Sequence, residues 1–193
     1  LSARFSLPYS LWNGVDYANL GNMEAYQDED GNPDQAKIDQ EKYKWLEFYK
    51  IKFKGTWYTR LVEKLVLRTH TEFGFLGAFN NDRGVIPFDR FFLGGDGMSQ
   101  YAMDGREMIS LRGYPNQSLS SGDGSTIYNR FSLELRYPIT LKPAASIFGL
   151  AFLEAGQGYD NFREFNPFNS KRSMGSGLRI FMPAFGLLGI DFG

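Results

Sequence analysis

The 193-residue sequence carries 21 basic and 22 acidic side chains, a net charge of −1 that gives no support for nucleic-acid binding. It contains no cysteine, which excludes disulfides and thiolate chemistry, and no stretch approaches the roughly 20 apolar residues of a membrane helix. Its 18 Phe, 11 Tyr and 22 Gly accompany a mean hydropathy of −0.35, which is typical of a barrel whose strands are apolar on one face only.

Strand-like alternation begins at the N-terminus, where residues 1–11 place apolar and polar side chains at successive positions. Residues 43–57 alternate more strictly, with Trp45 and Trp57 near the two ends of an apolar odd row. The even row holds five lysines: Lys42, Lys44, Lys50, Lys52 and Lys54. A helix would scatter these lysines around its axis, whereas a strand puts them on one face. We therefore predict a membrane strand with an apolar outside and a basic, wet inside.

The same alternation recurs in five further segments: 65–79, 127–137, 146–156, 172–182 and 187–192. The total is about seven strands. A sheet of this kind in water would expose its apolar rows, whereas a bilayer covers them. The predicted fold class is all-β, an antiparallel transmembrane β-barrel in the bacterial outer membrane, with outer-membrane lipids around it.

The predicted connections alternate in length. Short ones lie near residues 58–63, 138–145 and 183–186, and long polar ones near 13–41, 80–125 and 158–171. Bacterial barrels have short periplasmic turns and long extracellular loops, so we expect Leu1 to lie on the periplasmic side. These barrels also close with an even number of strands. Because seven is odd and the chain begins without Met, we expect a partial barrel from a processed product or a fragment.

Three polar features have simple interpretations. His70, the only histidine, points into the lumen by alternation, where we expect hydrogen bonding, and no cluster of ligands predicts a metal or a cofactor. The acidic segment 28–34 lacks the spacing of a calcium loop and predicts a solvated tip that opens a short helix near Pro33. The lysine row is expected to solvate the lumen, the alternative being a surface for an acidic partner or a lipid headgroup.

A motif lies within the longest connection. Phe91, Phe92 and Leu93 precede Gly94 and Gly95, and Leu111, Arg112, Gly113 and Tyr114 follow later. This order resembles the glycine pair and (V/L)RG(F/Y) signature of the BamA family, the outer-membrane protein assembly factors. The next two predicted strands carry Glu134 and Glu154, which look like the inward acids of that family. Segment 173–178, with Pro183 and Gly186 after it, resembles the family's penultimate hairpin.

The resemblance runs from about Leu1 to Gly193 and departs from the family pattern twice. Residues 96–110 separate the glycine pair from the arginine turn, and the chain ends where one more strand would be expected. The resemblance implies that residues 1–193 are the C-terminal portion of a barrel domain, with a lumen-entering loop at about 80–125. The N-terminal barrel strands and the periplasmic POTRA domains would lie outside this sequence.

The expected role of Arg112 agrees with its chemistry. A guanidinium is planar, always charged and suited to carboxylates. Alternation places Glu134 and Glu154 on the inward faces of neighbouring strands, so we expect Arg112 to enter the lumen and bond one or both. Gly113 would let the backbone turn sharply beside it. Alternation alone favours the simpler interpretation of an arginine in a solvated loop, and the resemblance reverses that preference.

The resemblance implies a factor that folds and inserts β-barrel clients, in which this segment forms wall and carries the bracing loop. Its partners would be the remaining barrel strands, client proteins and lipoproteins of an assembly complex. Alternatives in the same superfamily are a two-partner secretion transporter and a translocation-assembly protein, and outside it a passive pore. A barrel enzyme would need a Ser/His or Asp/His constellation, for which only His70 is available, so we predict no enzymatic activity.

Overall fold

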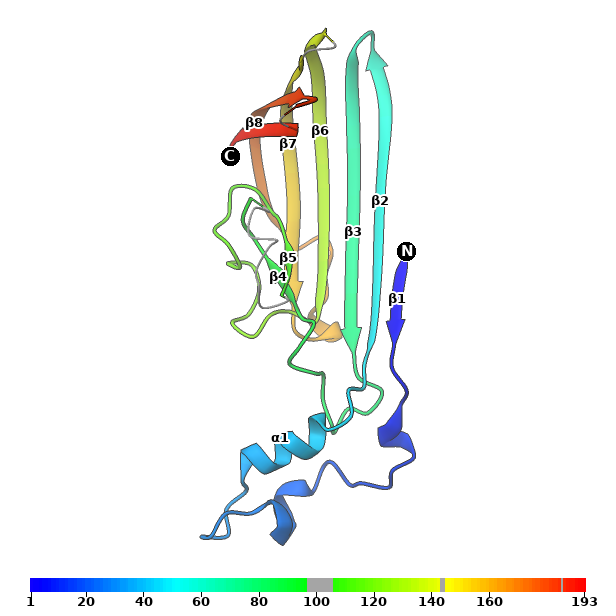
Figure 1. Ribbon diagram of the computed structural model, residues 1–193, viewed down its shortest axis with the longest axis vertical. Coiled ribbons are helices and arrows are strands. Elements are labelled where there is room, and N and C mark those ends of the chain that lie inside the picture. The colour runs from blue at the N-terminus through cyan, green and yellow to red at the C-terminus, as the bar shows by residue number, and fades with distance from the viewer. Residues whose placement is uncertain (97–105, 143–144, 185) are drawn as a thin grey trace.

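The computed structural model describes residues 1–96, 106–142, 145–184 and 186–193. Its main feature is a curved antiparallel sheet in the order β1-β2-β3-β6-β7-β8-β9 (Figure 1). These strands are β1 Ser2–Phe5, β2 Tyr49–Val62, β3 Leu65–Gly77, β6 Ile127–Lys142, β7 Ala145–Tyr159, β8 Lys171–Met182 and β9 Gly186–Phe192. Two short strands of the long loop, β4 Phe91–Leu93 and β5 Glu107–Ile109, pair in parallel. The predicted antiparallel sheet of seven strands is confirmed.

The helices lie in the long connections, at the end of the sheet opposite the β2–β3 turn (Figure 1). They are α1 Gln35–Tyr43 and the 3₁₀ turns η1 Tyr9–Leu11, η2 Leu20–Asn22, η3 Glu24–Tyr26 and η5 Phe162–Glu164. Asp34 caps α1, since its carboxylate accepts hydrogen bonds from the backbone N–H of Ala36 and Lys37 at 3.0 and 3.3 Å. In the described part of the chain, every helix is too short or too polar to cross a membrane.

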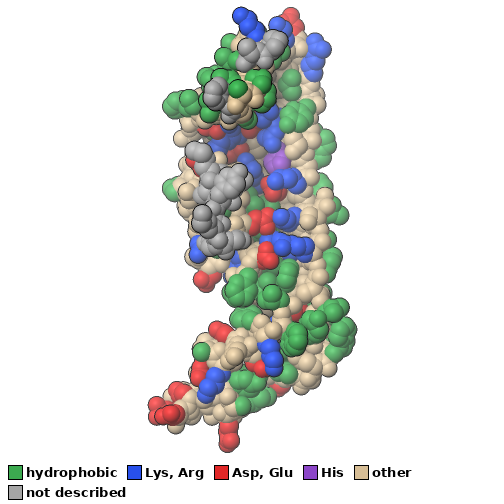
Figure 2. Space-filling model, in the orientation of Figure 1, with side chains coloured by type: hydrophobic (Ala, Val, Ile, Leu, Met, Phe, Trp, Pro, Cys, Tyr) green, Lys and Arg blue, Asp and Glu red, His purple; other side chains and the backbone are tan. Residues whose placement is uncertain are grey.

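The two faces of the sheet invert the burial pattern of a water-soluble protein. Leu133 and Leu153 on the outward face are 43% and 54% exposed, whereas the neighbouring Glu134 and Glu154 on the inward face are 4% and 2% exposed. Figure 2 shows basic and acidic side chains gathered over the sheet on the side of the long loop. An exposed apolar wall of this extent requires an apolar surrounding, which a bilayer supplies.

The main apolar core lies between the long loop and the inward face of the sheet. β4 lies against β6 and β7, and the ring of Phe91 meets that of Tyr128 edge-on with 4.6 Å between centroids. The buried members of this core are Leu76, Phe91, Leu93, Ile109, Leu111, Leu119 and Tyr128. The described parts of the loop are therefore packed onto the wall. A second small core of Tyr17, Leu20 and Ile38 holds the excursion between β1 and β2 together.

The first predicted strand is too long, and the second is predicted to begin too early. Strand β1 ends at Phe5, because residues 9–11 turn into η1. The strand predicted from residue 43 begins only at Tyr49, because α1 continues through Tyr43. Lys42 and Lys44 from the lysine row, and Trp45, therefore lie outside the sheet. The alternation of side chains continues across the end of α1, so it does not show where β2 begins. The start of β2 depends on tertiary packing.

Glu47, which alternation groups with the outward apolar row, is 1% exposed and buried among polar partners. Its carboxylate accepts hydrogen bonds from the backbone N–H and the hydroxyl of Ser10, at 2.7 and 2.6 Å, and pairs with Arg83 at 3.4 Å. Arg83 also donates to the carbonyls of Lys42 and Trp45. This cluster ties the excursion between β1 and β2 to the start of the long loop, through partners that are far apart in sequence.

Two predicted short connections are largely strand. β2 runs to Val62, so only Glu63 and Lys64 turn the chain into β3. β6 continues through Pro138 to Lys142, and the missing N–H of Pro138 is tolerated because the register shifts there. Residues 143–144 and 185, in the connections predicted at 138–145 and 183–186, lie outside the described residues.

Candidate functional site

The glycine pair and the arginine turn are neighbours in space, although residues 96–110 separate them in sequence; of these, 97–105 lie outside the described residues. The N–H of Gly94 donates to the carbonyl of Ile109, and that of Leu111 to the carbonyl of Gly95, each at 3.0 Å. Gly94 and Gly95 have φ values of 116° and 92°, which side chains other than glycine rarely adopt. Leu111 is completely buried in the loop core. The two halves of the motif thus form one structural unit.

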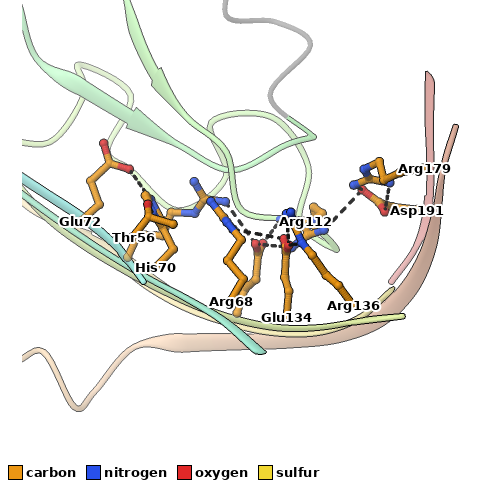
Figure 3. A network of polar contacts seen from close by, with 11 residues as sticks. Thr56, Arg68, His70, Glu72, Arg112, Glu134, Arg136, Arg179 and Asp191 are labelled. Atoms are coloured by element: carbon orange, nitrogen blue, oxygen red, sulfur yellow. Dashed lines mark hydrogen bonds and ion pairs between the residues drawn. The ribbon is translucent and has the colours of Figure 1, made fainter. Parts of the chain in front are cut away.

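Arg112 extends from this unit to the wall and contacts two adjacent strands (Figure 3). Its Nη2 donates to Oε1 of Glu134 on β6 and to Oε1 of Glu154 on β7, each at 2.7 Å. Its backbone N–H donates to Oε2 of Glu154 at 2.9 Å. All three side chains are buried. The structure brings together the arginine and both acids selected from the sequence, with one nitrogen shared between two carboxylates.

Each of the two carboxylates has other arginine partners on the wall. Arg136 donates to Oε2 of Glu134 from Nε and Nη2, at 2.9 and 2.6 Å. Arg130 donates to Oε1 of Glu154 at 3.1 Å. Arg68 lies 3.4 Å from Glu134. Arg112 therefore enters a network in which each acid is already held by a neighbouring cation.

The Arg112 guanidinium is also enclosed by apolar and acidic groups of the last strands. It lies 3.8 Å from the centre of the Phe152 ring, and its Nη1 is 3.5 Å from Asp191 on β9. Burial acts to lower the pKa of this guanidinium, but the adjoining carboxylates of Glu154 and Glu134 outweigh burial and raise it above its usual value. Arg112 stays charged at any physiological pH, so the site is an ionic anchor that transfers no proton.

Gly113 and Tyr114 complete the turn against β8. Gly113 has a φ of 84°, and a Cβ added there would lie 3.1 Å from the Cβ of Ser173. The hydroxyl of Tyr114 donates to the carbonyl of Arg172 at 2.8 Å. The turn thus contacts β8 as well as β6 and β7.

Part of the lysine row faces acids that the sequence analysis missed. Lys50 and Lys52 on β2 pair with Glu107 of the loop at 2.8 and 2.6 Å, and Lys50 also contacts Asp89. Lys54 lies 3.3 Å from Glu72. The Lys50 side chain is fully buried, so the expectation that it solvates the lumen is wrong. A row of inward lysines does signal a need for carboxylates, but not which carboxylates.

His70 makes the expected hydrogen bonds on the inward face (Figure 3). Its Nδ1 lies 2.8 Å from the hydroxyl of Thr56, and its Nε2 lies 3.4 Å from Glu72. Glu72 also accepts a hydrogen bond from the Tyr128 hydroxyl at 2.9 Å. Within the described residues, no group of three or more His, Cys, Asp or Glu side chains could hold a metal ion.

The acidic segment 28–34 forms an exposed turn before α1, as expected. One carboxylate oxygen of Asp28 accepts hydrogen bonds from the N–H groups of Asp30 and Asn32 at 3.0 and 2.8 Å. The bond from Asn32 lowers the pKa of Asp28. The segment thus uses one of its own carboxylates to close its turn.

Comparison with known protein families identifies a match that covers most of the chain. Residues 16–193 match a family described as the Omp85 superfamily domain. The matched range includes β2 and all later strands, the long loop and every residue of the arginine network. A search of curated proteins found no match.

Proposed function

The chain belongs to the Omp85 superfamily, and we propose that it is part of an assembly factor that folds and inserts β-barrel proteins into the bacterial outer membrane. Members of this superfamily are bacterial outer-membrane proteins that assemble or transport other proteins and perform no enzymatic chemistry. The seven-stranded sheet is accordingly part of a β-barrel. The narrower assignment to a BamA-like assembly factor rests on the order of the glycine pair, the arginine turn and the two acids.

In this proposal residues 1–193 are the C-terminal portion of the barrel domain. The strands form wall, and the loop at about 80–125 braces the lumen. Insertion would proceed by addition of client strands to a temporarily open barrel edge, which needs backbone hydrogen bonds and no covalent step. The partners would be client barrels, lipids, the rest of the parent barrel and lipoproteins of an assembly complex.

The observation that supports a bracing role is the contact of Arg112 with Glu134 and Glu154. A buried ion pair is a weak source of net stability, because desolvation offsets the attraction between the charges. It is a strong geometric constraint, however, since one side chain of the loop must meet two carboxylates on adjacent strands at hydrogen-bonding distance. An arginine held by two adjacent strands therefore fixes the position of the loop more than it stabilises the fold.

The test is Arg112→Ala in the full-length parent protein. We expect lower levels of assembled outer-membrane β-barrels and new protease sensitivity of the loop in intact cells. Arg163→Ala, at an exposed position of the β7–β8 connection, is the matched control and should behave like the wild type. Arg106 is a poor control, because its guanidinium lies 4.9 Å from the centre of the Phe92 ring in the same loop. Normal barrel levels with a protected loop in the Arg112→Ala strain would contradict the proposal.

The same superfamily match also admits a two-partner secretion or translocation-assembly transporter, and the experiment separates these from an assembly factor. Depletion of the parent should reduce many unrelated barrels if it is a general assembly factor. Loss of one secreted or surface protein, with normal barrel levels, would favour a transporter. Steady open conductance in planar bilayers, with neither defect in cells, would favour a passive pore.

A further inference from the structure

The segment of the long loop that leads into β4 and the segment that begins β5 both contact Lys50 of the wall. Lys50 on β2 donates from Nζ to the backbone carbonyl and the carboxylate of Asp89, at 2.6 and 3.0 Å. The same Nζ lies 2.8 Å from the carboxylate of Glu107. Asp89 directly precedes Arg90 and β4, whereas Glu107 opens β5. The single ammonium group of Lys50 therefore holds the two loop segments, at Asp89 and at Glu107, close to each other and to the wall.

The surroundings of Lys50 show a cation that is fully enclosed and fully paired. Its side chain is 0% exposed, and Nζ lies 4.5 Å from the centre of the Phe91 ring. Glu107 has a second cation in Lys52 at 2.6 Å. Asp89 has a second cation in Arg4 on β1 at 3.0 Å. An ammonium group is tolerated in such a place only when carboxylates compensate for the lost hydration.

This cluster is separate from the Arg112 network and has the opposite polarity. Lys50 lies on β2, and β3 separates it from the strands that carry Glu134 and Glu154. At Lys50 the wall supplies the cations and the loop supplies the carboxylates, whereas at Arg112 the loop supplies the cation and the wall supplies the carboxylates that it contacts. A loop placed the other way round would bring Arg112 to Lys50 and Lys52 of β2. Such like-charge contacts disfavour the wrong seating.

We infer that Lys50 is a positioning residue. It is a second anchor of the loop and acts together with Arg112 to fix one position of the Arg112 turn in the lumen. The inference rests on the proposed function, because it assigns Lys50 a role in client assembly through the position of the loop. Lys50 touches no client in this scheme. It holds the loop at Asp89 and Glu107 so that the turn around Arg112 reaches β6, β7 and β8.

The experiment measures loop position and client assembly separately in the full-length parent. Spin labels at Ser110 in the loop and Tyr137 on the outward face of β6 report the distance between loop and wall. Lys50→Met should broaden that distance distribution, with the displaced population rising by about tenfold, the order expected for one charge-assisted hydrogen bond. Lys50→Arg should keep the distribution narrow. Lys64→Met, at the exposed turn of the same hairpin, is the matched control.

A neutral triple variant separates positioning from stability. Lys50→Met combined with Asp89→Asn and Glu107→Gln leaves none of the three groups as an uncompensated charge. The cations that lose a carboxylate, Arg4 and Lys52, have side chains that reach solvent, 52% and 28% exposed, so folding, read by the heat-modifiable gel shift, should recover. Loop position and client assembly should remain impaired if Lys50 acts by positioning. Full recovery of client assembly in the triple variant, or a narrow distribution in Lys50→Met, would overturn the inference. A broadened distribution in Lys50→Met, with normal assembly in both it and Arg112→Ala, would support the anchor and contradict the proposed function.

Discussion

At Arg112, one terminal nitrogen serves two carboxylates, and the backbone N–H of the same residue holds the second of them. The side chain therefore does not form the two-pronged pair with a single carboxylate that arginine often makes. A lysine ammonium could in principle replace one shared nitrogen, but it lacks the flat face that lies on the Phe152 ring. This geometry predicts graded effects of substitution at the position.

Arg112→Ala is expected to lower the free energy of unfolding of the parent barrel by about 1.5–3 kcal/mol, because its hydrogen bonds to Glu134 and Glu154 are lost while Arg136 and Arg130 still compensate the two acids. Arg112→Lys should lose roughly half as much, because the charge remains while the ring contact and part of the hydrogen bonding are lost. Urea unfolding followed by the heat-modifiable gel shift measures both. Equal losses for Lys and Ala would show that charge contributes little at this position.

Gly74 is a second position with a specific requirement, because there is no room for a side chain larger than hydrogen. It pairs with Tyr128 across β3 and β6, and an added Cβ would collide with the Tyr128 ring and lie 2.9 Å from Phe91. Tyr128 is fully buried, and its hydroxyl is bonded to Glu72, so the ring has little freedom to move. The ring of Tyr128 thus covers a glycine on the neighbouring strand.

Gly74→Ala should therefore destabilise the barrel by about 1–3 kcal/mol through overpacking. Gly149→Ala on β7 is the control, because its nearest neighbour would be the Cδ1 of Ile139 at an ordinary 3.9 Å. The test is to compare the urea concentrations at which the two variants are half unfolded, and we expect the lower value for Gly74→Ala. A Gly74→Ala midpoint equal to that of Gly149→Ala would mean that the Tyr128 ring moves aside at no cost.

At the level of the elements, the Lys50 anchor has a defined response to acid. The Lys50 anchor depends on carboxylates of the loop itself. Burial acts to raise the pKa of Glu107 and of Asp89, but their hydrogen bonds and charge contacts with Lys50 outweigh burial and hold both pKa values below the ordinary 4.5 and 3.8. A carboxyl with a lowered pKa contributes stability that is present above its ordinary value and is lost as pH falls through the lowered value.

The β4–β5 end of the loop should accordingly stay in place from neutral pH down to about pH 5 and loosen only below about pH 4. The measurement is the mobility of a spin label at Ser110 as a function of pH, with the parent in a bilayer. Glu107→Gln should remove part of this acid transition, because one titrating group is gone. An unchanged transition in Glu107→Gln would assign the loosening to other groups.

At the scale of the whole molecule, the long connections lie at one end of the sheet and the β2–β3 turn at the other (Figure 1). Barrels of the outer membrane place long loops outside the cell. Cysteines introduced at Asp30 and Asn166, both exposed in long connections, should react with an impermeant maleimide on intact cells. A cysteine at Lys142, at the other end of β6, should stay protected until the outer membrane is permeabilised. The reverse pattern would invert the orientation of the sheet.

Much of this fold could be predicted from the local alternation of side chains, and the errors in that prediction have local causes. Strands β3, β6, β7, β8 and β9 were predicted to within about five residues, because inward and outward side chains alternate along them, whereas the short loop strands β4 and β5 were not predicted. The start of β2 was misplaced, because alternation continues through Lys44 and Trp45 although α1 precedes them and Glu47 is drawn into a buried cluster. Arg112, Glu134 and Glu154 were selected together only because the motif order resembles a known family.

Local alternation was enough to predict the two faces of the main sheet, its number of strands and the polarity of each face, because these depend on residues two positions apart. Which charged side chains pair with one another depends on contacts between distant parts of the chain. Lys50 lies 39 residues from Asp89 along the chain, and Arg112 lies 42 residues from Glu154. Contacts of that separation depend on the curvature of the sheet and on how the long loop packs against it. Local periodicity carries no information on either, so the second anchor appeared only in the structure.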